Sequence, residues 1–221
     1  METDEFGIPL LAAVTGASER KRVAITQAAI KEFVRHGYSG ASVESIAATS
    51  GVSKPTVYSH FGNKEQLFLA VIGSYLRDSY TDFDELADRI VEATDLRAAL
   101  IDFAGSLGEI LLRDDLVTLR RLVIGEVDRF PQLGELWAQI SQAKNDEPLM
   151  RALTTLREQG RLDVPNPLRA VRQLIALTVG SAQLIRTLRP SYEFAEGELE
   201  DLVTSGVEAF LKYYSLAAYA D

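Results

Sequence analysis

Apolar residues recur at intervals of three and four through most of this chain, the spacing that places them on one face of an α-helix. The chain has no convincing run of β-branched and aromatic residues bounded by turns, which would indicate a strand. We therefore predict an all-α fold. In the N-terminal part, helices are expected at about residues 19–36, 42–50 and 53–62, and a long fourth one after Asn63.

Polar and glycine residues mark where these helices begin and end. Ser42, Ser53 and Asn63 can each accept a hydrogen bond from a free backbone N–H of a first helical turn. Gly37 is expected to end the first helix at a positive φ, a conformation that glycine adopts without steric cost. The tight turn Gly51-Val52-Ser53 joins the second and third helices and folds them against each other.

The rest of the chain predicts further helices with weak breaks between them, at about residues 96–112, 133–140, 168–188 and 196–214. No internal repeat, low-complexity block or long linker separates them. We expect three parts: an N-terminal arm over residues 1–18, which should be flexible, a small helical domain over residues 19–65, and a larger helical domain over residues 66–221.

The composition is that of an ordinary soluble globular chain, with 221 residues, of which 47% are hydrophobic and 25% charged. The chain has no cysteine, which excludes disulfides and thiolate sites and is typical of the cytoplasm, where we expect the protein. The apolar stretch 8–13 follows acidic residues rather than lysines and is too short for a membrane helix. We expect neither a signal peptide nor a membrane anchor.

The net charge of −9 argues against a nucleic-acid partner, because DNA binding requires Lys and Arg to replace the counterions around phosphates. The charge is unevenly distributed, however. Residues 18–64 contain seven basic and three acidic residues, whereas residues 65–221 contain 16 basic and 26 acidic ones. This distribution predicts a small cationic module with one function, attached to a larger acidic body with another.

The two short helices, their turn and the basic segment around them form a helix-turn-helix pattern. Val57 and Phe61 are spaced to face the core, which leaves a face suited to phosphates and base edges: Lys54, Pro55, Thr56, Tyr58, Ser59 and His60. Lys64 opposes the dipole of the next helix, an arrangement that an external phosphate would explain. The pattern also fits an ordinary three-helix packing corner, with Tyr58 half-buried and His60 simply solvated.

A string of short motifs runs through residues 20–68: Ala28-Ala29, Phe33, His36-Gly37-Tyr38, Ser42-Val43, Ile46-Ala47, Gly51-Val52-Ser53, Thr56-Val57-Tyr58, His60-Phe61 and Lys64-Glu65-Gln66-Leu67-Phe68. These motifs resemble the DNA-binding domain of the TetR/AcrR family of bacterial transcriptional regulators. Ser45 and Ser50 depart from the family pattern, since many relatives have an acid and an alanine there. The segment 122–133 is similar to one found in the AcrR-like branch of the family.

The resemblance implies a ligand-responsive repressor that a small molecule releases from a palindromic operator in double-stranded DNA. The expected DNA contacts are Ser42, Ser53, Lys54, Pro55, Thr56, Tyr58, His60 and Lys64. Of these, Pro55, Thr56 and His60 would face the major groove, and Tyr58 and Lys64 would clamp phosphates.

The remainder of the chain should then resemble the ligand-binding and dimerisation domain of the family. Apolar residues that would line a pocket for a largely apolar effector are Phe103, Leu107, Leu111, Leu119, Leu122, Val123, Trp137 and Ile140. The same residues also fit a plain core, which is the favoured interpretation for any one of them. The helices at 168–188 and 196–214 carry more apolar surface than one core needs, and the resemblance implies that they pair with their copies in a homodimer.

Catalytic chemistry finds little support in the sequence. Both histidines, His36 and His60, lie in the basic module, so the acidic part has neither a His nor a Cys for a metal site or a nucleophile relay. We expect no enzyme activity, no metal and no cofactor. The alternative to a regulator is an all-helical protein-interaction module without sequence-specific DNA binding, which the acidic total favours.

Overall fold

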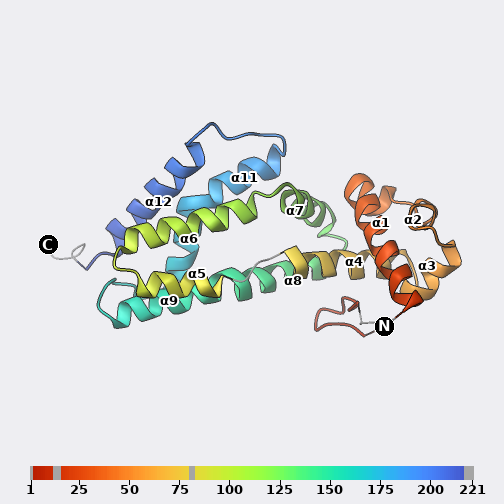
Figure 1. Cartoon of the computed structure of the whole chain (residues 1–221), viewed down its shortest axis with the longest axis horizontal. Coiled ribbons are helices and arrows are strands. Elements are labelled where there is room, and N and C mark those ends of the chain that lie inside the picture. The colour runs from red at the N-terminus through yellow and green to blue at the C-terminus, as the bar shows by residue number, and fades with distance from the viewer. Residues whose placement is uncertain (1, 12–15, 80–82, 217–221) are drawn as a thin grey trace. The chain divides into compact units, whose positions relative to one another are not determined.

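The computed structural model describes residues 2–11, 16–79 and 83–216. Over these ranges the chain is helical and forms no β-strand, which confirms the predicted all-α fold (Figure 1). Packing divides the chain into two compact units: unit 1 comprises residues 1–79 and 118–140, and unit 2 comprises residues 80–117 and 141–221. The three-part functional division expected from the sequence stays a prediction, and the packing units do not follow it.

Unit 1 contains a three-helix group and a long buried helix. Its elements are α1 (Ala17–Gly40), α2 (Val43–Ser50), α3 (Lys54–Phe61), α4 (Lys64–Ser79), the later part of α7 (Asp114–Glu126) and nearly all of α8 (Pro131–Ser141). α1 packs against α2 and α4, and α3 packs against both of its neighbours in sequence (Figure 1). Every residue from Leu67 to Gly73 in α4 is buried, so this helix is the centre of the unit 1 core.

Gly37 has the predicted positive φ, but α1 continues beyond its predicted end at residue 36. Gly37 breaks the helix after His36 with φ 65° and ψ −178°, a conformation that residues with a side chain rarely adopt. The chain then makes a further short stretch of helix up to Gly40. The break turns Tyr38 into the core, where it is 7% exposed.

The residues before α1 form a hairpin that no sequence pattern predicted. Asp4 closes it, because its carboxylate accepts two backbone N–H groups, one of them from Ile8 (2.8 Å). Ile8 is fully buried beside Gly73 of α4, and Asp4 forms an ion pair with Arg77 of the same helix. The described part of the predicted arm is therefore packed on α4.

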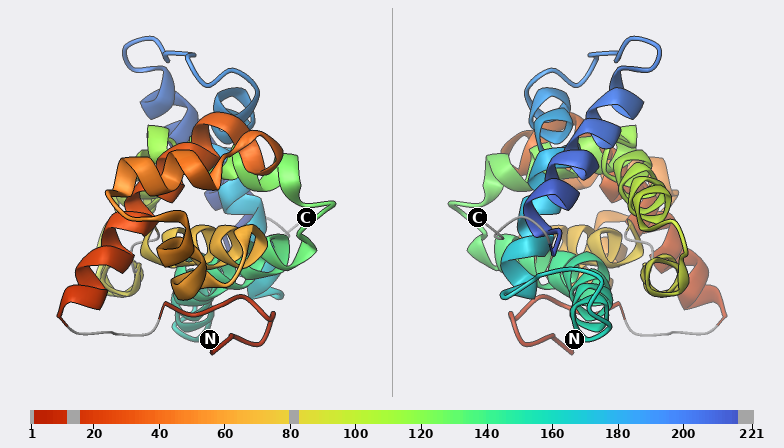
Figure 2. Two further views of the ribbon diagram at one scale, coloured as in Figure 1. Left: turned by 90° about the vertical axis from the view of Figure 1, so that its right-hand side faces the viewer. Right: turned by 90° about the vertical axis from the view of Figure 1, so that its left-hand side faces the viewer.

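Unit 2 is a bundle of helices with two π-helical segments, η1 and η2. Its elements are α5 (Asp84–Glu92), α6 (Leu96–Leu111), the start of α7, η1 (Gln142–Asp146), α9 (Glu147–Glu158), α10 (Pro167–Ile175), η2 (Ala176–Gly180), α11 (Ser181–Leu188) and α12 (Glu198–Tyr214). α5 packs on α9, α9 on α10, and α12 on both α6 and η2 (Figure 2). The predicted bounds of α6 and α12 hold to within two residues.

The helix predicted over residues 168–188 forms, but the π-helical segment η2 lies within it. Thr178 in η2 is buried, and its hydroxyl donates to the Leu174 carbonyl (2.7 Å). The Leu177 carbonyl faces Gly206 of α12 so closely that a Cβ at position 206 would lie 2.4 Å from its oxygen. The close packing of α12 on η2 therefore requires glycine at this position.

Replacing Gly206 with alanine should destabilise unit 2. The new methyl group would overlap the Leu177 backbone, which cannot rotate away, so α12 and η2 must separate and lose buried contacts. We expect the free energy of unfolding, measured by urea denaturation, to fall by about 1–3 kcal/mol. Gly105→Ala in α6 is the matched control, because nothing lies within 4 Å of its Cβ position and alanine favours helix. Equal losses in the two variants would contradict the close-packing argument.

Candidate nucleic-acid interface

The turn between α2 and α3 has the geometry predicted for it. Gly51 is left-handed, with φ 70° and ψ 25°, and its N–H donates to the Ala48 carbonyl (3.3 Å). The Val52 N–H then donates to the Ala47 carbonyl (3.1 Å), which completes the reversal. α2 and α3 pack against each other as the two helices of a helix-turn-helix.

The predicted capping residues are confirmed. Ser42 Oγ accepts the Ser45 N–H (3.3 Å) at the start of α2, and Ser53 Oγ accepts the Thr56 N–H (3.3 Å) at the start of α3. Ser53 Oγ also shares a hydrogen bond with the Thr56 hydroxyl (2.8 Å). The hydroxyls of Ser42 and Ser53, which are also predicted DNA contacts, thus cap the N-terminal ends of α2 and α3.

A carboxylate that the sequence analysis did not single out fixes α2 on α1. Glu32 accepts the Ser42 backbone N–H (2.9 Å) with one oxygen and the Ser45 hydroxyl (2.8 Å) with the other. The Ser42 hydrogen bond is the main cause that lowers the pKa of Glu32, with further lowering from Ser45 and from the charge of His36. Burial opposes this effect. Ser45 therefore has a bonding role of its own here.

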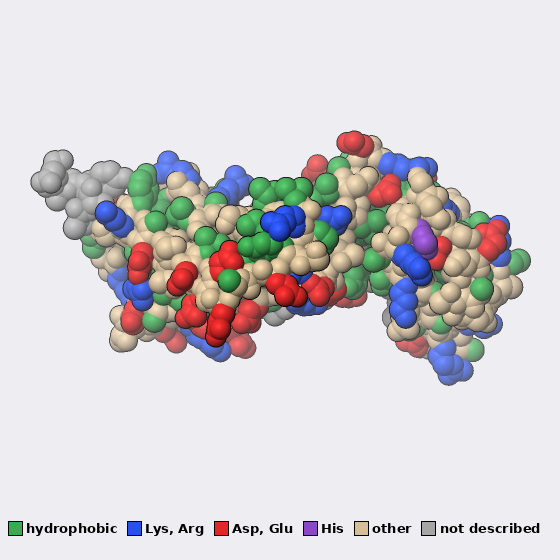
Figure 3. Space-filling model, turned by 90° about the horizontal axis from the view of Figure 1, so that it is seen from above, with side chains coloured by type: hydrophobic (Ala, Val, Ile, Leu, Met, Phe, Trp, Pro, Cys, Tyr) green, Lys and Arg blue, Asp and Glu red, His purple; other side chains and the backbone are tan. Residues whose placement is uncertain are grey.

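The side chains of α3 divide into a buried and an accessible face, as predicted. Val57 and Phe61 are 0% and 1% exposed, whereas Pro55 and Ser59 are exposed. The other predicted contacts on this helix, Lys54, Thr56, Tyr58 and His60, are partly exposed. Figure 3 shows basic side chains and a histidine on the surface of the helix-turn-helix part.

The charge of Lys54 is paired on the protein surface. Its ammonium group forms an ion pair with Glu44 of α2 and lies 5.7 Å from the centre of the Tyr58 ring. The hydrogen bond from Lys54 lowers the pKa of Glu44 to about 2, and the same bond raises the pKa of Lys54. A phosphate that binds Lys54 therefore competes with Glu44 for the ammonium group.

Lys64 is the first residue of α4 and points back to the end of α1. Its ammonium group donates to the Ser39 carbonyl (3.3 Å) and lies 4.8 Å from the centre of the Tyr38 ring. It is partly exposed at this position. Its predicted role at a phosphate stays a prediction, and its second role in fixing the end of α1 is visible only in the structure.

The end of α1 is held by the last residue of α7 and by the turn that follows it. The Tyr38 backbone N–H donates to Glu126 Oε1 (2.8 Å). The Tyr38 ring lies 5.2 Å from the ring of Phe68 and 4.8 Å from that of Phe130, and the guanidinium of Arg129 lies 4.2 Å from it. The segment 122–133 was singled out by its resemblance, but no spacing rule indicated this contact.

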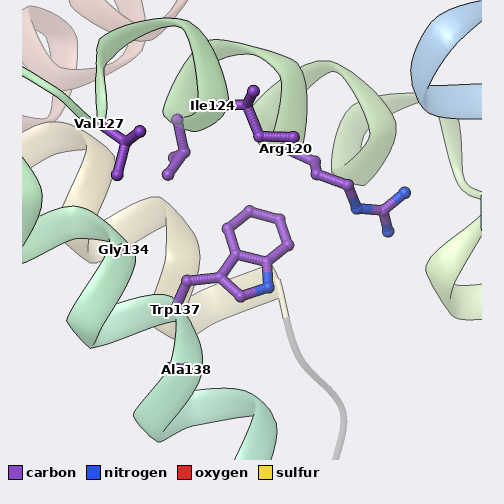
Figure 4. Close-up of a pocket in the computed structure, with 7 residues that line it drawn as sticks. Arg120, Ile124, Val127, Gly134, Trp137 and Ala138 are labelled. Carbon is purple, nitrogen blue, oxygen red and sulfur yellow. The ribbon is translucent and has the colours of Figure 1, made fainter. Parts of the chain in front are cut away.

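The residues predicted to line an effector pocket separate into several places. Val123 and Trp137 line a cavity of about 290 Å³ between α7 and α8 (Figure 4), and Leu122 lines another of about 270 Å³ between α1 and α7. The remaining predicted residues are buried or partly buried in unit 1 (Leu119, Ile140) or in α6 of unit 2 (Phe103, Leu107, Leu111). Their contact with an effector stays a prediction.

Within residues 2–11, 16–79 and 83–216, no three or more His, Cys, Asp or Glu side chains cluster in a way that could hold a metal ion. None of the helices there combines the length and the apolar character needed to cross a membrane.

Family models match both the N-terminal and the C-terminal part of the chain. A family model described as "Bacterial regulatory proteins, tetR family" matches residues 25–71, the helix-turn-helix and the start of α4. A second model, described as "AefR-like transcriptional repressor, C-terminal domain", matches residues 98–216, more than half of the chain.

Individual relatives agree with the family models. The HTH-type transcriptional repressor SCO4008 of Streptomyces coelicolor is 38% identical over 60 residues, which are 27% of this chain and 31% of that repressor. A solved TetR-family transcriptional regulator from Mesorhizobium loti is 31% identical, with a TM-score of 0.77 over 91% of this chain and 100% of that one. The flavonoid-responsive regulator FrrA is 28% identical, with a TM-score of 0.69 over 90% and 99% of the two chains.

Replacing Glu32 with glutamine should loosen α2 from α1. We expect a loss of about 1 kcal/mol in the free energy of unfolding at neutral pH, because the charge-assisted bonds to Ser42 and Ser45 weaken. The folded-state pKa of Glu32 lies below its unfolded value of about 4.3, so its stabilisation is complete above that pH and is lost as the pH falls through the folded pKa.

Urea denaturation at a series of pH values measures this effect. The difference between the wild type and Glu32→Gln should be constant near neutrality and shrink below about pH 4. Lys31→Gln, at an exposed position next to Glu32, should match the wild type throughout. A difference between wild type and Glu32→Gln that persists unchanged in acid would show that the carboxylate charge is irrelevant.

Proposed function

Since this chain belongs to the TetR family of bacterial transcriptional regulators, we propose that it is a dimeric repressor that a small, largely apolar molecule releases from a palindromic operator. Members of this family bind DNA, and the chain is accordingly a DNA-binding transcriptional regulator and not an enzyme. The earlier expectations of family, fold class and regulatory function are thereby confirmed. The operator, the dimer contact and the effector are the proposed part.

The observation that carries the proposal is the accessible face of α3. Ser53 caps this helix, the turn at Gly51 sets it across α2, and Val57 and Phe61 anchor its other face in the core. A helix held in this way can enter the major groove with its N-terminal residues toward base edges. We assign base contacts to Pro55, Thr56 and His60.

Phosphate contacts would fix the orientation of α3 on the duplex. We assign them to Lys54, Tyr58 and Lys64, with the N-terminal ends of α2 and α3 at Ser42 and Ser53 as further contacts. The ion pair between Lys54 and Glu44 is exposed, so exchanging the carboxylate for a phosphate costs little in water. The acidic total of the chain is thus compatible with a local DNA-binding surface.

Exposed leucines in unit 2 support a dimer contact through the helices predicted for it. Leu177, Leu184 and Leu188 are 44%, 60% and 70% exposed, and their spacings of seven and four residues place them on one side of the helix that runs from η2 into α11. Tyr213 at the end of α12 is 49% exposed. In the view from the side that carries α11 and α12, hydrophobic side chains are open to solvent (Figure 3).

The effector is expected to be small and largely apolar. The cavity between α7 and α8 is of the right character, since all but one of its lining side chains are apolar or aromatic. FrrA, similar in fold over nearly its whole length, is named as responsive to flavonoids, which are small aromatic molecules. We propose that an effector shifts the protein toward a conformer that fits both half-sites less well.

The DNA contacts predict two different kinds of variant. Lys54→Ala should weaken binding to all sequences alike and reduce the slope of log affinity against log salt by about one, because one phosphate contact is lost. His60→Ala should instead change which base is preferred, at a cost of about 1–3 kcal/mol on the preferred operator. Selection from genomic DNA fragments, followed by affinity measurements across salt concentrations, tests both.

Arg157→Ala is the control for these variants, since Arg157 is an exposed cation on α9 in unit 2. It should leave both affinity and salt slope unchanged. If no fragment is enriched and binding is equally weak on every sequence, the helical protein-interaction module replaces the repressor as the better account.

Placing a charged side chain on the proposed dimer surface tests whether it is the contact. Leu184→Glu should shift the protein toward monomer. Leu184 is exposed in the single chain, and in the proposed dimer the glutamate would be a buried charge without a partner. Leu168→Glu is the control, since Leu168 is also exposed (37%) but lies about two and a half helical turns before Leu177, toward another side. Sedimentation equilibrium measures both, and a Leu184→Glu protein that remains dimeric would exclude this surface.

A further inference from the structure

The cavity between α7 and α8 has one charged wall. Its lining residues are Arg120, Val123, Ile124 and Val127 on one side and Gly134, Trp137 and Ala138 on the other. Figure 4 shows the Trp137 indole across the gap from Ile124, with Val127 at one end of the gap and the Arg120 side chain extending past the indole at the other. Gly134 carries no side chain that would fill the space between the two helices.

The charged group borders a cavity whose other lining residues are apolar or aromatic. Arg120 is only 9% exposed, and its guanidinium carbon lies 5.9 Å from the centre of the Trp137 ring. An electrostatic interaction is stronger in such a partly dry site than on an open surface. A guanidinium group also matches the two oxygens of a carboxylate in one plane.

We propose that this cavity binds a planar aromatic anion, with its ring against Trp137 and its acid group at Arg120. Val123, Ile124 and Val127 would cover the other face of the ring. An organic cation would meet the like charge of Arg120, and an aliphatic acid would leave the indole surface without a stacking partner. The inference rests on the proposed function, since it names the class of effector.

The same stretch of chain connects the cavity to the helix-turn-helix within unit 1. Val127 lines the cavity, and the preceding Glu126 accepts the Tyr38 N–H at the break in α1. Arg129 and Phe130 pack on the Tyr38 ring two and three residues later. A ligand that displaces Val127 therefore also displaces the groups that fix the end of α1.

Trp137 allows the binding to be measured directly, because it is the one tryptophan in the sequence. The probes are trans-cinnamate, trans-cinnamamide and cinnamylamine, which share a planar aromatic frame and carry a negative, no and a positive charge. Titrations follow Trp137 fluorescence, with calorimetry as the second readout. We expect cinnamate to bind at least about tenfold more tightly than the amide, and the amine more weakly than either.

Two neighbouring arginines provide the matched variants. Arg120→Gln should weaken cinnamate binding about tenfold and change binding of the amide by no more than about twofold. Arg121→Gln, at the exposed position that follows, should change neither. Equal binding of all three probes, no binding of cinnamate, or equal effects of the two variants would overturn the proposal.

A third variant covers the case in which Arg120→Gln does not fold. Ala138→Leu fills the cavity from an exposed position and keeps a good helix former in α8, so it should abolish binding of cinnamate and the amide alike. Unchanged binding of both probes to Ala138→Leu would place them elsewhere and overturn the site.

Operator binding gives the final readout. Cinnamate should weaken the affinity of the wild type for its selected operator, and Glu126→Gln should still bind cinnamate but show a smaller loss of operator affinity. A protein that binds cinnamate through Arg120 but no DNA would contradict the proposed function and leave the site intact. A protein that binds its operator but not cinnamate would overturn the site alone.

Discussion

The hydrogen bond between Tyr38 and Glu126 joins the two stretches of sequence that build unit 1. The Tyr38 N–H lies at the break that Gly37 makes in α1, and Glu126 at the end of α7 accepts it at 2.8 Å. A backbone N–H left without an acceptor in a core costs about 1–3 kcal/mol, so the break is tolerable only while α7 supplies the carboxylate. The rings of Tyr38, Phe68 and Phe130 close around this point. The positions of α1, and of α2 packed on it, thus depend on α7.

The acidic residues of the helix-turn-helix explain how an acidic chain can present a DNA-binding surface. Glu32 accepts hydrogen bonds from Ser42 and Ser45, and Glu44 forms an ion pair with Lys54. The first carboxylate serves the fold, and the second can be exchanged for a phosphate at low cost because the pair is exposed. Acids farther away than the Debye length, about 8 Å at physiological ionic strength, are largely screened. The local surface matters more for binding than the net charge of −9.

Local rules predicted the helices and caps well and the long-range contacts poorly. Ser42, Ser53 and Gly51 act within a few residues of themselves, so capping and turn chemistry identify them from sequence alone. The bond from Tyr38 to Glu126 spans 88 residues, and nothing in the spacing of either segment encodes it. The hairpin of residues 2–11 and the π-helical segment η2 were missed for the same reason: the hairpin packs on α4 and η2 packs on α12, both distant in sequence. Apolar residues such as Leu107 fit a core as well as a pocket, and periodicity alone does not show which of them border empty space.

The arrangement of unit 1 also limits how an effector can act. A ligand changes an equilibrium only by as much as its affinity differs between the two conformers. A cavity far from the DNA-binding helices would need a chain of rearrangements to create that difference. Here the wall residue Val127 is adjacent to Glu126, whose bond fixes α1. A ligand in the proposed site supplies the differential affinity only if it fits the conformer with a displaced Val127 better than the other one. Its acid group at Arg120 would determine which ligand binds, and its contact with Val127 how strongly DNA binding is weakened.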